Sequence, residues 1–298
     1  PGAEITDELP PTRTRAILDA IQSDIAPKLD QSGALEKANL LRGLDGKFVA
    51  PGPSGAPTRG RLDVLPTGRN FYSLDNRAVP TQTAWELGGK SAENLVTRHF
   101  QDHGLYLKSI VLSVWGTANM RTGGDDIAQA LALIGAKPKW DFGSTRVSGY
   151  EIIPLAKMNR PRVDVTLRIS GFFRDAFPAQ IELFDRAIRA IGALDEPEDM
   201  NPIAARMRSD ALELMQKGRD EDDAAMEAGY RIFGSKPGSY GAGLQGIMDS
   251  GRWNELGDIA ETFLNWGQEA YGTKANGTVA RSALINRRKN IDAGVHHP

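Results

Sequence analysis

The chain has 298 residues, a formal net charge of −2, no cysteine, 40% hydrophobic residues and 25% charged residues. These proportions are typical of a folded protein with a sizeable core, and they exclude wholesale disorder. The absence of cysteine excludes disulfide bonds, cysteine-ligated metal sites and a thiol nucleophile. A nearly balanced charge argues against a general binding surface for nucleic acid or anionic membrane, so neither is expected as a partner.

The ends of the chain and its apolar stretches indicate its setting. No apolar run reaches the ~18 residues that a membrane span needs, and no basic region followed by an apolar stretch marks a signal peptide. The chain opens at Pro1 without a methionine and closes at Pro298 without a change in composition. We therefore expect it to be an internal piece of a longer protein.

The first part of the chain combines helix with a stretch rich in proline and glycine. Isoleucines spaced by four residues predict an amphipathic helix over 13–30, and a second short helix is expected near 35–41. Residues 47–81 are dense in proline and glycine, which is typical of a linker or of a functional loop. Aromatic and charged side chains in the second half of this stretch favour the functional loop.

From residue 105 to residue 194, strands alternate with helices. β-Branched apolar runs predict strands at 109–116, 150–155 and 162–170, and in the last of these the alternation predicts one wetter face. Helical periodicity predicts helices at 82–103, 127–135 and 179–194. This order predicts an α/β fold: an open, mostly parallel sheet with βα loops forming a ligand-facing edge, flanked by helical segments.

Changes in composition and in predicted secondary structure along the chain divide it into three parts. Residues 1–60 form a helical lead-in with a Pro/Gly-rich segment, and 61–195 form the α/β core domain. Residues 196–298 are expected to be a mainly helical segment that continues into further sequence. It includes charged helices up to 233, a helix over 253–272 and a polar, basic end.

The turn at 115–126 is expected where a strand ends, the place where open α/β sheets bind ligands. Its backbone N–H groups, Thr117 and Arg121 suit a carboxylate or a phosphate. Alternatively, Thr122 and the aspartates that follow simply cap the next helix. The turn matches neither GxxxxGK[ST] nor GxGxxG, so a standard loop for ATP or a dinucleotide is not supported.

Two further loops offer polar groups. The turn after the strand at 162–170 carries Arg174 and Asp175, which either face a ligand beside the first turn or pair with each other. The glycine-rich loop at 234–246 offers the hydroxyl groups of Ser239 and Tyr240, although such loops are often only connections.

Histidines and acidic runs have simpler explanations. His99 and His103 lie four residues apart on one predicted helix, but no HExxH arrangement accompanies them, and a role at the helix C-terminus is favoured. The terminal His296 and His297 carry little weight, and the acidic run at 220–223 is typical of a solvated face. No GxSxG motif supplies a serine nucleophile.

Three long segments resemble the hallmark segments of the large subunit of class I metal chelatases. They are LPTGRNFYSLDNRAVPTQTAWELG (65–88), WGTANMRTGGDDIAQALALIGAKP (115–138) and RPRVDVTLRISGFFRDAF (160–177). The family comprises the cobaltochelatase subunit CobN and the corresponding large subunit of magnesium chelatase. RNFYSLD, GTANMRTGGDD and PGPSGAPTRGR are similar to the cobalt branch, whereas the magnesium branch more often has a GKNIHALD-like stretch and a TYGE-like turn.

The resemblance implies a portion of the large, tetrapyrrole-binding subunit of a cytoplasmic, ATP-dependent cobaltochelatase. Such an enzyme inserts Co(II), its substrate metal, into the corrin precursor hydrogenobyrinic acid a,c-diamide in aerobic cobalamin biosynthesis. Mg-ATP would be used by a separate AAA+ ATPase subunit that works with an adaptor subunit. The missing nucleotide loop is consistent with this division of labour.

The implied chemistry suggests roles for the polar loop residues. Metal insertion displaces N–H protons from the macrocycle, whose peripheral carboxylates and amides suit arginines and backbone N–H groups. Asp75 and Asp175 are the candidate proton acceptors or ion-pair partners, and the metal ligands stay unassigned. Alternatively, the same residues only fasten the loops to one another. The candidate substrate-binding residues are Arg69, Asn70, Thr117, Arg121, Arg174, Ser239 and Tyr240.

Two other functions stay open. The chain could belong to a magnesium chelatase that acts on protoporphyrin IX. It could also be a non-catalytic region that docks the AAA+ subunits while catalysis takes place elsewhere in the longer chain.

Overall fold

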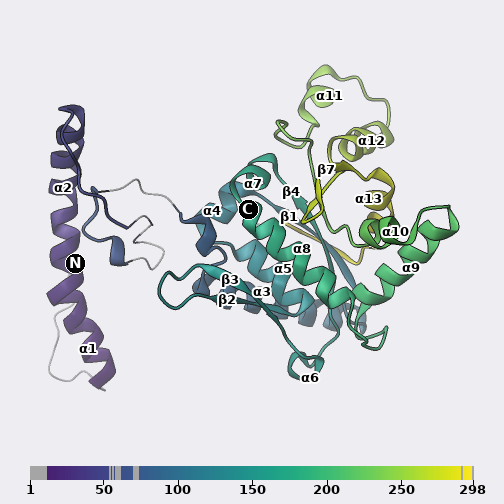
Figure 1. Cartoon of the computed structure of the whole chain (residues 1–298), viewed down its shortest axis with the longest axis horizontal. Helices are drawn as coiled ribbons and strands as arrows, with labels where there is room; N and C mark the ends of the chain where they lie inside the picture. Colours follow the sequence, from purple (N-terminus) through teal and green to yellow (C-terminus); the bar gives the residue numbers. More distant parts are fainter. Residues whose placement is uncertain are drawn as a thin grey trace. The chain divides into compact units, whose positions relative to one another are not determined.

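The computed structural model describes residues 12–53, 55, 57, 62–69, 74–289 and 291–296. The chain forms two compact units, residues 1–75 and residues 76–298 (Figure 1). The predicted division at residue 195 stays a prediction, but strands from both sides of it share one sheet.

The first unit is built on one continuous helical segment. It consists of α1 (Thr12–Ala20), a π-helical turn at Ile21–Ile25 and α2 (Ala26–Leu44). The expectation of two separate helices was therefore wrong. No proline interrupts the connecting residues, and Gly33 inside a helix costs only about 1 kcal/mol relative to alanine.

Part of the Pro/Gly-rich stretch lies against α2 within this unit. The Thr67 backbone N–H donates to the Ser32 hydroxyl at 3.0 Å, and the Asn39 amide donates to the Gly68 carbonyl at 2.9 Å. A 3-10 turn at Leu62–Val64 precedes these contacts. The described part of this stretch is thus an ordered loop, as expected.

The second unit contains a six-stranded sheet with the order β7-β6-β5-β4-β1-β8. Neighbouring strands are parallel from β5 through β4 and β1 to β8, and β6 and β7 add antiparallel pairs at one edge. This confirms the open, mostly parallel sheet. The strands are β1 (Ser109–Val114), β4 (Asp164–Ile169), β5 (Ile232–Gly234), β6 (Glu269–Gly272), β7 (Ala275–Val279) and β8 (Ala293–His296).

A separate antiparallel hairpin holds the strand that was expected near 150–155. It pairs β2 (Ala136–Trp140) with β3 (Val147–Ile152), so β3 does not join the main sheet. The expectation of a third parallel strand was wrong because β3 follows β2 through a short turn. That turn positions Asp141, whose carboxylate accepts hydrogen bonds from Ser144.

Helices follow the predicted pattern most closely around the sheet. α3 (Gln82–His103) has the predicted bounds: the Thr81 side chain caps its first turn, and Gly104 follows its end in the left-handed conformation. The other helices of this unit are α4 (Gly116–Thr122), α5 (Asp125–Ile134), α6 (Leu155–Met158), α7 (Gly171–Ala176), α8 (Pro178–Gly192), α9 (Pro202–Gln216), α10 (Glu221–Ala228), α11 (Gln245–Ser250), α12 (Leu256–Trp266) and α13 (Arg281–Arg288).

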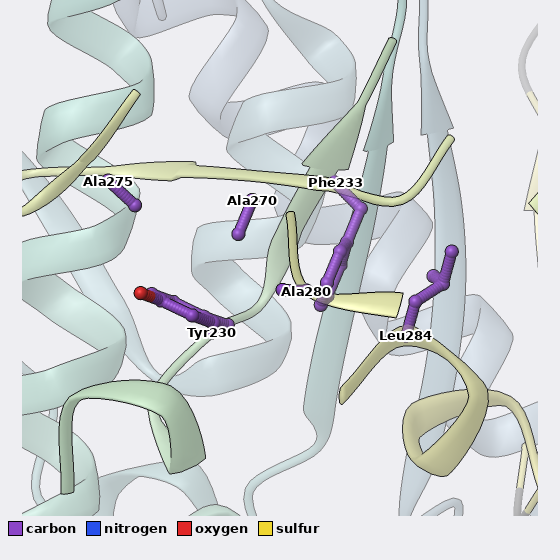
Figure 2. Packing of buried hydrophobic residues seen from close by; sticks show 6 residues of the cluster. All are labelled: Tyr230, Phe233, Ala270, Ala275, Ala280 and Leu284. Carbon is purple, nitrogen blue, oxygen red and sulfur yellow. The ribbon is translucent and has the colours of Figure 1, made fainter. Parts of the chain in front are cut away.

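Strand β4 is covered on both faces, so the expectation of a wetter face was wrong. Val165, Leu167 and Ile169 are buried, and α5 packs against β4 and β1 (Figure 1). The alternate residues meet the last helices: the Arg168 guanidinium lies 5.3 Å from the Phe263 ring centre of α12. Near β5, an apolar cluster places Phe233 beside Ala280 and Leu284 (Figure 2).

Several short elements differ from the sequence predictions. The turns expected at 115–126 and 171–178 contain the short helices α4 and α7, because their polar residues also fit helical turns. Residues 269–272, expected to be helical, form β6 after α12 ends at Gly267. Strands of three to five residues carry too few side chains for a clear period, so β2, β5, β7 and β8 left no signal.

A buried ion cluster ties the amino ends of the central strands to α9 and α13. Asp164 accepts hydrogen bonds from Arg231 at 2.6 and 3.1 Å and from Arg287 at 2.8 Å. Arg287 also pairs with Asp210. Burial alone would raise the pKa of Asp164, but the two arginines bring it below its ordinary value. Every charge of the cluster is thus paired, which makes its burial tolerable.

Among the described residues, no helix is both long enough and apolar enough to cross a bilayer.

Candidate functional site

Three loops meet at the carboxyl ends of the parallel strands. α4 follows β1, α7 follows β4, and the segment 235–244 follows β5. Helices α4 and α7 pack against each other. All three loops that the sequence singled out in this unit therefore lie at one edge of the sheet, where open α/β folds bind ligands.

Arg174 on α7 is the centre of the contacts at this edge. Its Nε and Nη2 atoms donate to the two Asp175 carboxylate oxygens at 2.6 and 2.8 Å. Its Nη1 atom donates to the carbonyls of Ser235 at 3.1 Å, Lys236 at 2.8 Å and Ser239 at 3.3 Å. Arg174 is only 7% exposed, so the guanidinium fastens the 235–244 segment to α7.

Asp175 and Tyr240 complete this cluster. The Tyr240 hydroxyl donates to Asp175 Oδ2 at 2.7 Å, and the Arg174 guanidinium carbon lies 5.6 Å from the Tyr240 ring centre. The hydrogen bonds from Arg174, and then that from Tyr240, hold the pKa of Asp175 below its ordinary value. Asp175 is therefore an ionised acceptor near neutral pH, and Tyr240 presents an exposed ring beside it.

Ser239 takes part through its backbone. Its carbonyl accepts hydrogen bonds from the Ser235 hydroxyl at 2.8 Å and from Arg174. Gly171 lies so close to this carbonyl that a Cβ atom there would collide with it. The sequence identified the two segments but not this backbone contact, and it missed Ser235 and Tyr271, whose hydroxyl donates to the Ser235 carbonyl at 2.5 Å.

Thr117 and Arg121 are exposed on α4, which packs against α7, the helix that carries Arg174 and Asp175. The Gly116 N–H donates to the Ser170 hydroxyl at 3.2 Å, and the same hydroxyl caps α7 by accepting the Phe173 N–H at 3.1 Å. A Cβ at Gly116 would collide with Phe172 and Phe173, so only glycine lets α4 approach α7 this closely.

The aspartates after this turn have different roles from those expected. The N-cap residue of α5 is Gly124, and the Thr122 hydroxyl accepts the N–H groups of Gly124 and Asp125 at 3.3 and 3.2 Å, so Thr122 helps to start the helix as the simpler interpretation predicted. Asp126, however, is buried, and burial raises its pKa to about 7. The sequence missed this residue because an aspartate in the first turn of a helix is usually an exposed cap.

His296 also lies at this edge. It ends β8, which pairs with β1, and its ring meets the Trp115 ring edge-on at 6.4 Å between centres. The sequence offered no signal for this placement, because β8 is a short strand at the far end of the chain. His99 and His103 lie instead in the last turns of α3, with the His99 ring 3.1 Å from the Leu105 carbonyl.

The remaining predicted residues belong to the first unit. Arg69 is partly buried, and its Nε atom has no hydrogen-bond partner among the described residues. Asp75 ends this unit and is partly buried. Asn70 lies outside the described residues. The structure thus brings Arg174, Asp175, Ser239 and Tyr240 together, with Thr117 and Arg121 on the adjoining helix.

No group of three or more histidine, aspartate or glutamate side chains in the described part of the chain could hold a metal ion. The described site therefore consists of hydrogen-bond donors, an ionised carboxylate and a buried carboxyl group. Such an arrangement can bind carboxylates and amides and can hold a proton.

Comparisons with known proteins point to one family. A family model described as CobN/Magnesium Chelatase matches residues 3–298. An aerobic cobaltochelatase subunit CobN from Sinorhizobium sp is 60% identical over 284 residues, which are 95% of this chain and 22% of that protein. Another from Pseudomonas aeruginosa is 53% identical over 293 residues, 97% of this chain and 24% of that protein.

One solved structure and a relative from the magnesium branch also match this chain. The catalytic subunit of cobaltochelatase from Mycobacterium tuberculosis superposes with a TM-score of 0.76 at 43% identity, covering 96% of this chain and 24% of that one. A magnesium-chelatase subunit from Chlorobaculum parvum is 33% identical over 263 residues, 88% of this chain and 20% of that protein. The chain thus spans less than a quarter of the length of the curated relatives it matches.

Proposed function

The chain belongs to the CobN/magnesium chelatase family, and we propose that it forms part of the large, tetrapyrrole-binding subunit of an ATP-dependent cobaltochelatase. The observation that carries this proposal is the identity of 60% to a cobaltochelatase subunit over 95% of the chain, against 33% to a magnesium-chelatase subunit. The reaction is insertion of Co(II) into hydrogenobyrinic acid a,c-diamide during aerobic cobalamin biosynthesis, in the cytoplasm.

The loops at the carboxyl edge of the sheet hold the substrate in this proposal. Thr117 and Arg121 are exposed on α4 and face solvent as donors for the peripheral carboxylates and amides of the macrocycle. Tyr240 supplies an exposed aromatic ring beside Asp175 of α7, the helix against which α4 packs. Arg69, Asn70 and Asp75 on the first unit are further candidates for binding or for proton acceptance.

Arg174, Asp175 and Ser239 have a supporting role in the same proposal. The guanidinium of Arg174 donates hydrogen bonds to Asp175 and to three backbone carbonyls. It therefore positions the 235–244 segment and does not bind the substrate directly. Asp175 stays ionised because of this pairing, which makes it a poor proton acceptor near neutral pH. In this proposal Asp175 orients the Tyr240 ring by accepting the hydrogen bond of its hydroxyl group.

Metal insertion also needs energy and partners that this chain does not supply by any recognisable motif. We assign the use of Mg-ATP to a separate AAA+ ATPase subunit that acts with an adaptor subunit. The similarity to cobaltochelatase subunits and the missing phosphate loop in the sequence support this assignment.

Titration of the corrin precursor against the complete large subunit tests the proposal. Quenching of intrinsic fluorescence should report a lower Kd for hydrogenobyrinic acid a,c-diamide than for protoporphyrin IX. Arg121→Ala should raise this Kd about 10-fold, the loss expected for one charge-assisted hydrogen bond. Arg98→Ala, at an exposed ion pair on α3, is the matched control and should leave the Kd unchanged.

Other outcomes select among the alternatives. Tighter binding of protoporphyrin IX would assign the chain to the magnesium branch. Failure to bind either macrocycle, together with capture of the AAA+ subunit, would favour a docking region. An unchanged Kd in Arg121→Ala would remove that residue from the substrate site.

A further inference from the structure

Two neighbouring carboxyl groups lie at the start of α5, which follows β1 and α4 in the chain. Asp125 and Asp126 are the last two residues of the turn at 115–126 that the sequence singled out, and they occupy the first turn of α5. Asp126 is 1% exposed, whereas Asp125 is partly exposed. The backbone N–H of Trp115, at the end of β1, donates to the Asp126 carboxylate. The pair thus reaches from the interior to the carboxyl edge of the sheet.

The surroundings of Asp126 favour a bound proton. Burial contributes most to raising its pKa to about 7, and the negative charge of Asp125 raises it further. Arg121 on α4 and the Trp115 N–H act in the opposite direction. Helix α3 packs against α5 through Ala84, Gly88, Ala92 and Val96, which bring no charge.

Asn119 supplies a second, independent sign of a polar site under this turn. It lies on α4 and is 0% exposed, and neither its amide nitrogen nor its amide oxygen has a hydrogen-bond partner among the described residues. A buried amide ordinarily finds partners, because leaving its groups unsatisfied costs about 1–3 kcal/mol each. The turn therefore keeps spare hydrogen-bonding capacity in its interior.

We propose that Asp125 and Asp126 form a proton-sharing pair that accepts the macrocycle N–H proton displaced when cobalt enters the corrin precursor. This inference rests on the proposed function. One N–H bond breaks, its electron pair forms a nitrogen–cobalt bond, and the proton passes to the Asp125 carboxylate and on to Asp126. Asp126, being buried, acts through Asp125 as a positioning and proton-storing residue.

Asp175, the other carboxylate at this edge, does not fit the same role. Arg174 and Tyr240 stabilise its ionised form, so a proton taken up there would be lost at once near neutral pH. A group that titrates near the working pH transfers protons best. The two acidic positions at this edge are thus separated by their environments, one to hold charge and the other to hold a proton.

The pH dependence of cobalt insertion by the assembled multi-subunit enzyme tests this inference. In the wild type, kcat/KM should fall as the pH drops through about 7, because the pair must be fully ionised to accept a proton. Asp126→Asn should remove this limb while the Kd for the corrin precursor changes less than about 2-fold. Asp126→Glu should restore the limb in part.

Two further variants keep the test decisive. Asp125→Asn removes the negative charge that raises the pKa of Asp126, so it should move the limb to lower pH and reduce kcat/KM. This variant replaces Asp126→Asn in the test if Asp126→Asn does not fold. His296→Gln is the matched control, because histidine ordinarily titrates in the same range. It should leave the limb in place, since the His296 ring packs against the Trp115 ring and has no part in the proposed proton transfer.

The outcomes separate this inference from the proposed function. A limb near pH 7 that persists in Asp126→Asn, that does not move in Asp125→Asn, or that disappears in His296→Gln overturns the proton-sharing pair. In each of these cases the wild type still binds the corrin precursor and inserts cobalt. Loss of both activities in the wild type would instead overturn the proposed function.

Discussion

The Tyr240 hydroxyl donates to the Asp175 carboxylate at 2.7 Å, and this bond joins two loops that lie 65 residues apart in the chain. It raises the pKa of Tyr240 above its ordinary value, so the hydroxyl stays protonated and keeps donating across the physiological range. The glycine-rich segment after β5 is thereby held against α7 by both a buried arginine and an exposed tyrosine.

Tyr240→Phe removes this bond without changing the ring. We expect amide hydrogens in the 235–244 segment to exchange several-fold faster, because the segment then loses one of the side-chain contacts that fasten it to α7. Exchange measured by mass spectrometry checks this. Tyr106→Phe, at a tyrosine that packs on Phe100 after α3, is the control and should leave the segment unchanged. Equal exchange rates in Tyr240→Phe and wild type would contradict the fastening role.

Gly171→Ala tests the close approach of α7 to the same segment. A Cβ atom there collides with the Ser239 carbonyl oxygen, so we expect a loss of about 1–3 kcal/mol in the free energy of unfolding. Gly89→Ala is a matched control in α3, where a Cβ meets nothing within 4 Å, and should stabilise the chain by about 0.5–1 kcal/mol. Urea unfolding measures both, and a neutral Gly171→Ala would show that the contact is not tight.

Asp164→Asn tests the buried ion cluster at the opposite end of the strands. It leaves Arg231 and Arg287 without their shared carboxylate, so we expect a loss of about 3–5 kcal/mol in the free energy of unfolding. Asp102→Asn breaks an exposed pair with Arg98 and should change stability by less than about 0.5 kcal/mol. If the two variants unfold at the same urea concentration, the cluster does not stabilise the fold.

Asp126 makes stability depend on pH with a definite sign. The folded chain keeps the proton up to pH about 7, whereas the unfolded chain loses it near the ordinary pKa of 3.8. The folded state therefore binds more protons between these values, and stability falls as the pH rises through this window. The full effect above pH 7 is about 4 kcal/mol.

Asp126→Asn should abolish this decline and make the chain more stable than wild type at pH 8. Unfolding midpoints measured from pH 4 to pH 8 check the prediction. Asp141→Asn is the control: hydrogen bonds from Ser144 lower the pKa of Asp141, so this group works in the opposite direction and its loss leaves the decline in place. Parallel curves for wild type and Asp126→Asn would mean that Asp126 is ionised in the fold.

Much of the sheet-and-helix pattern was readable from local sequence. The predicted range 82–103 matches α3, because the Thr81 cap and the left-handed Gly104 that bound this helix act over only a few residues. The alternation of apolar strands with amphipathic helices was enough to predict an open parallel sheet and the edge that carries its loops. Family motifs in these loops pointed to the chelatases.

Only the tertiary structure decided which residues meet at that edge and in which charge state. The pairing of β8 with β1 brings His296 to Trp115 across most of the chain, and short strands leave no local signal of such pairings. Arg174 was identified by type, but its use as a fastener depends on carbonyls about 60 residues away. Composition, periodicity and motifs thus determined the fold class and the family, because each of them can be recognised within a short stretch of sequence. The proton on Asp126 depends on burial, and burial exists only once α4, α5 and β1 have packed together.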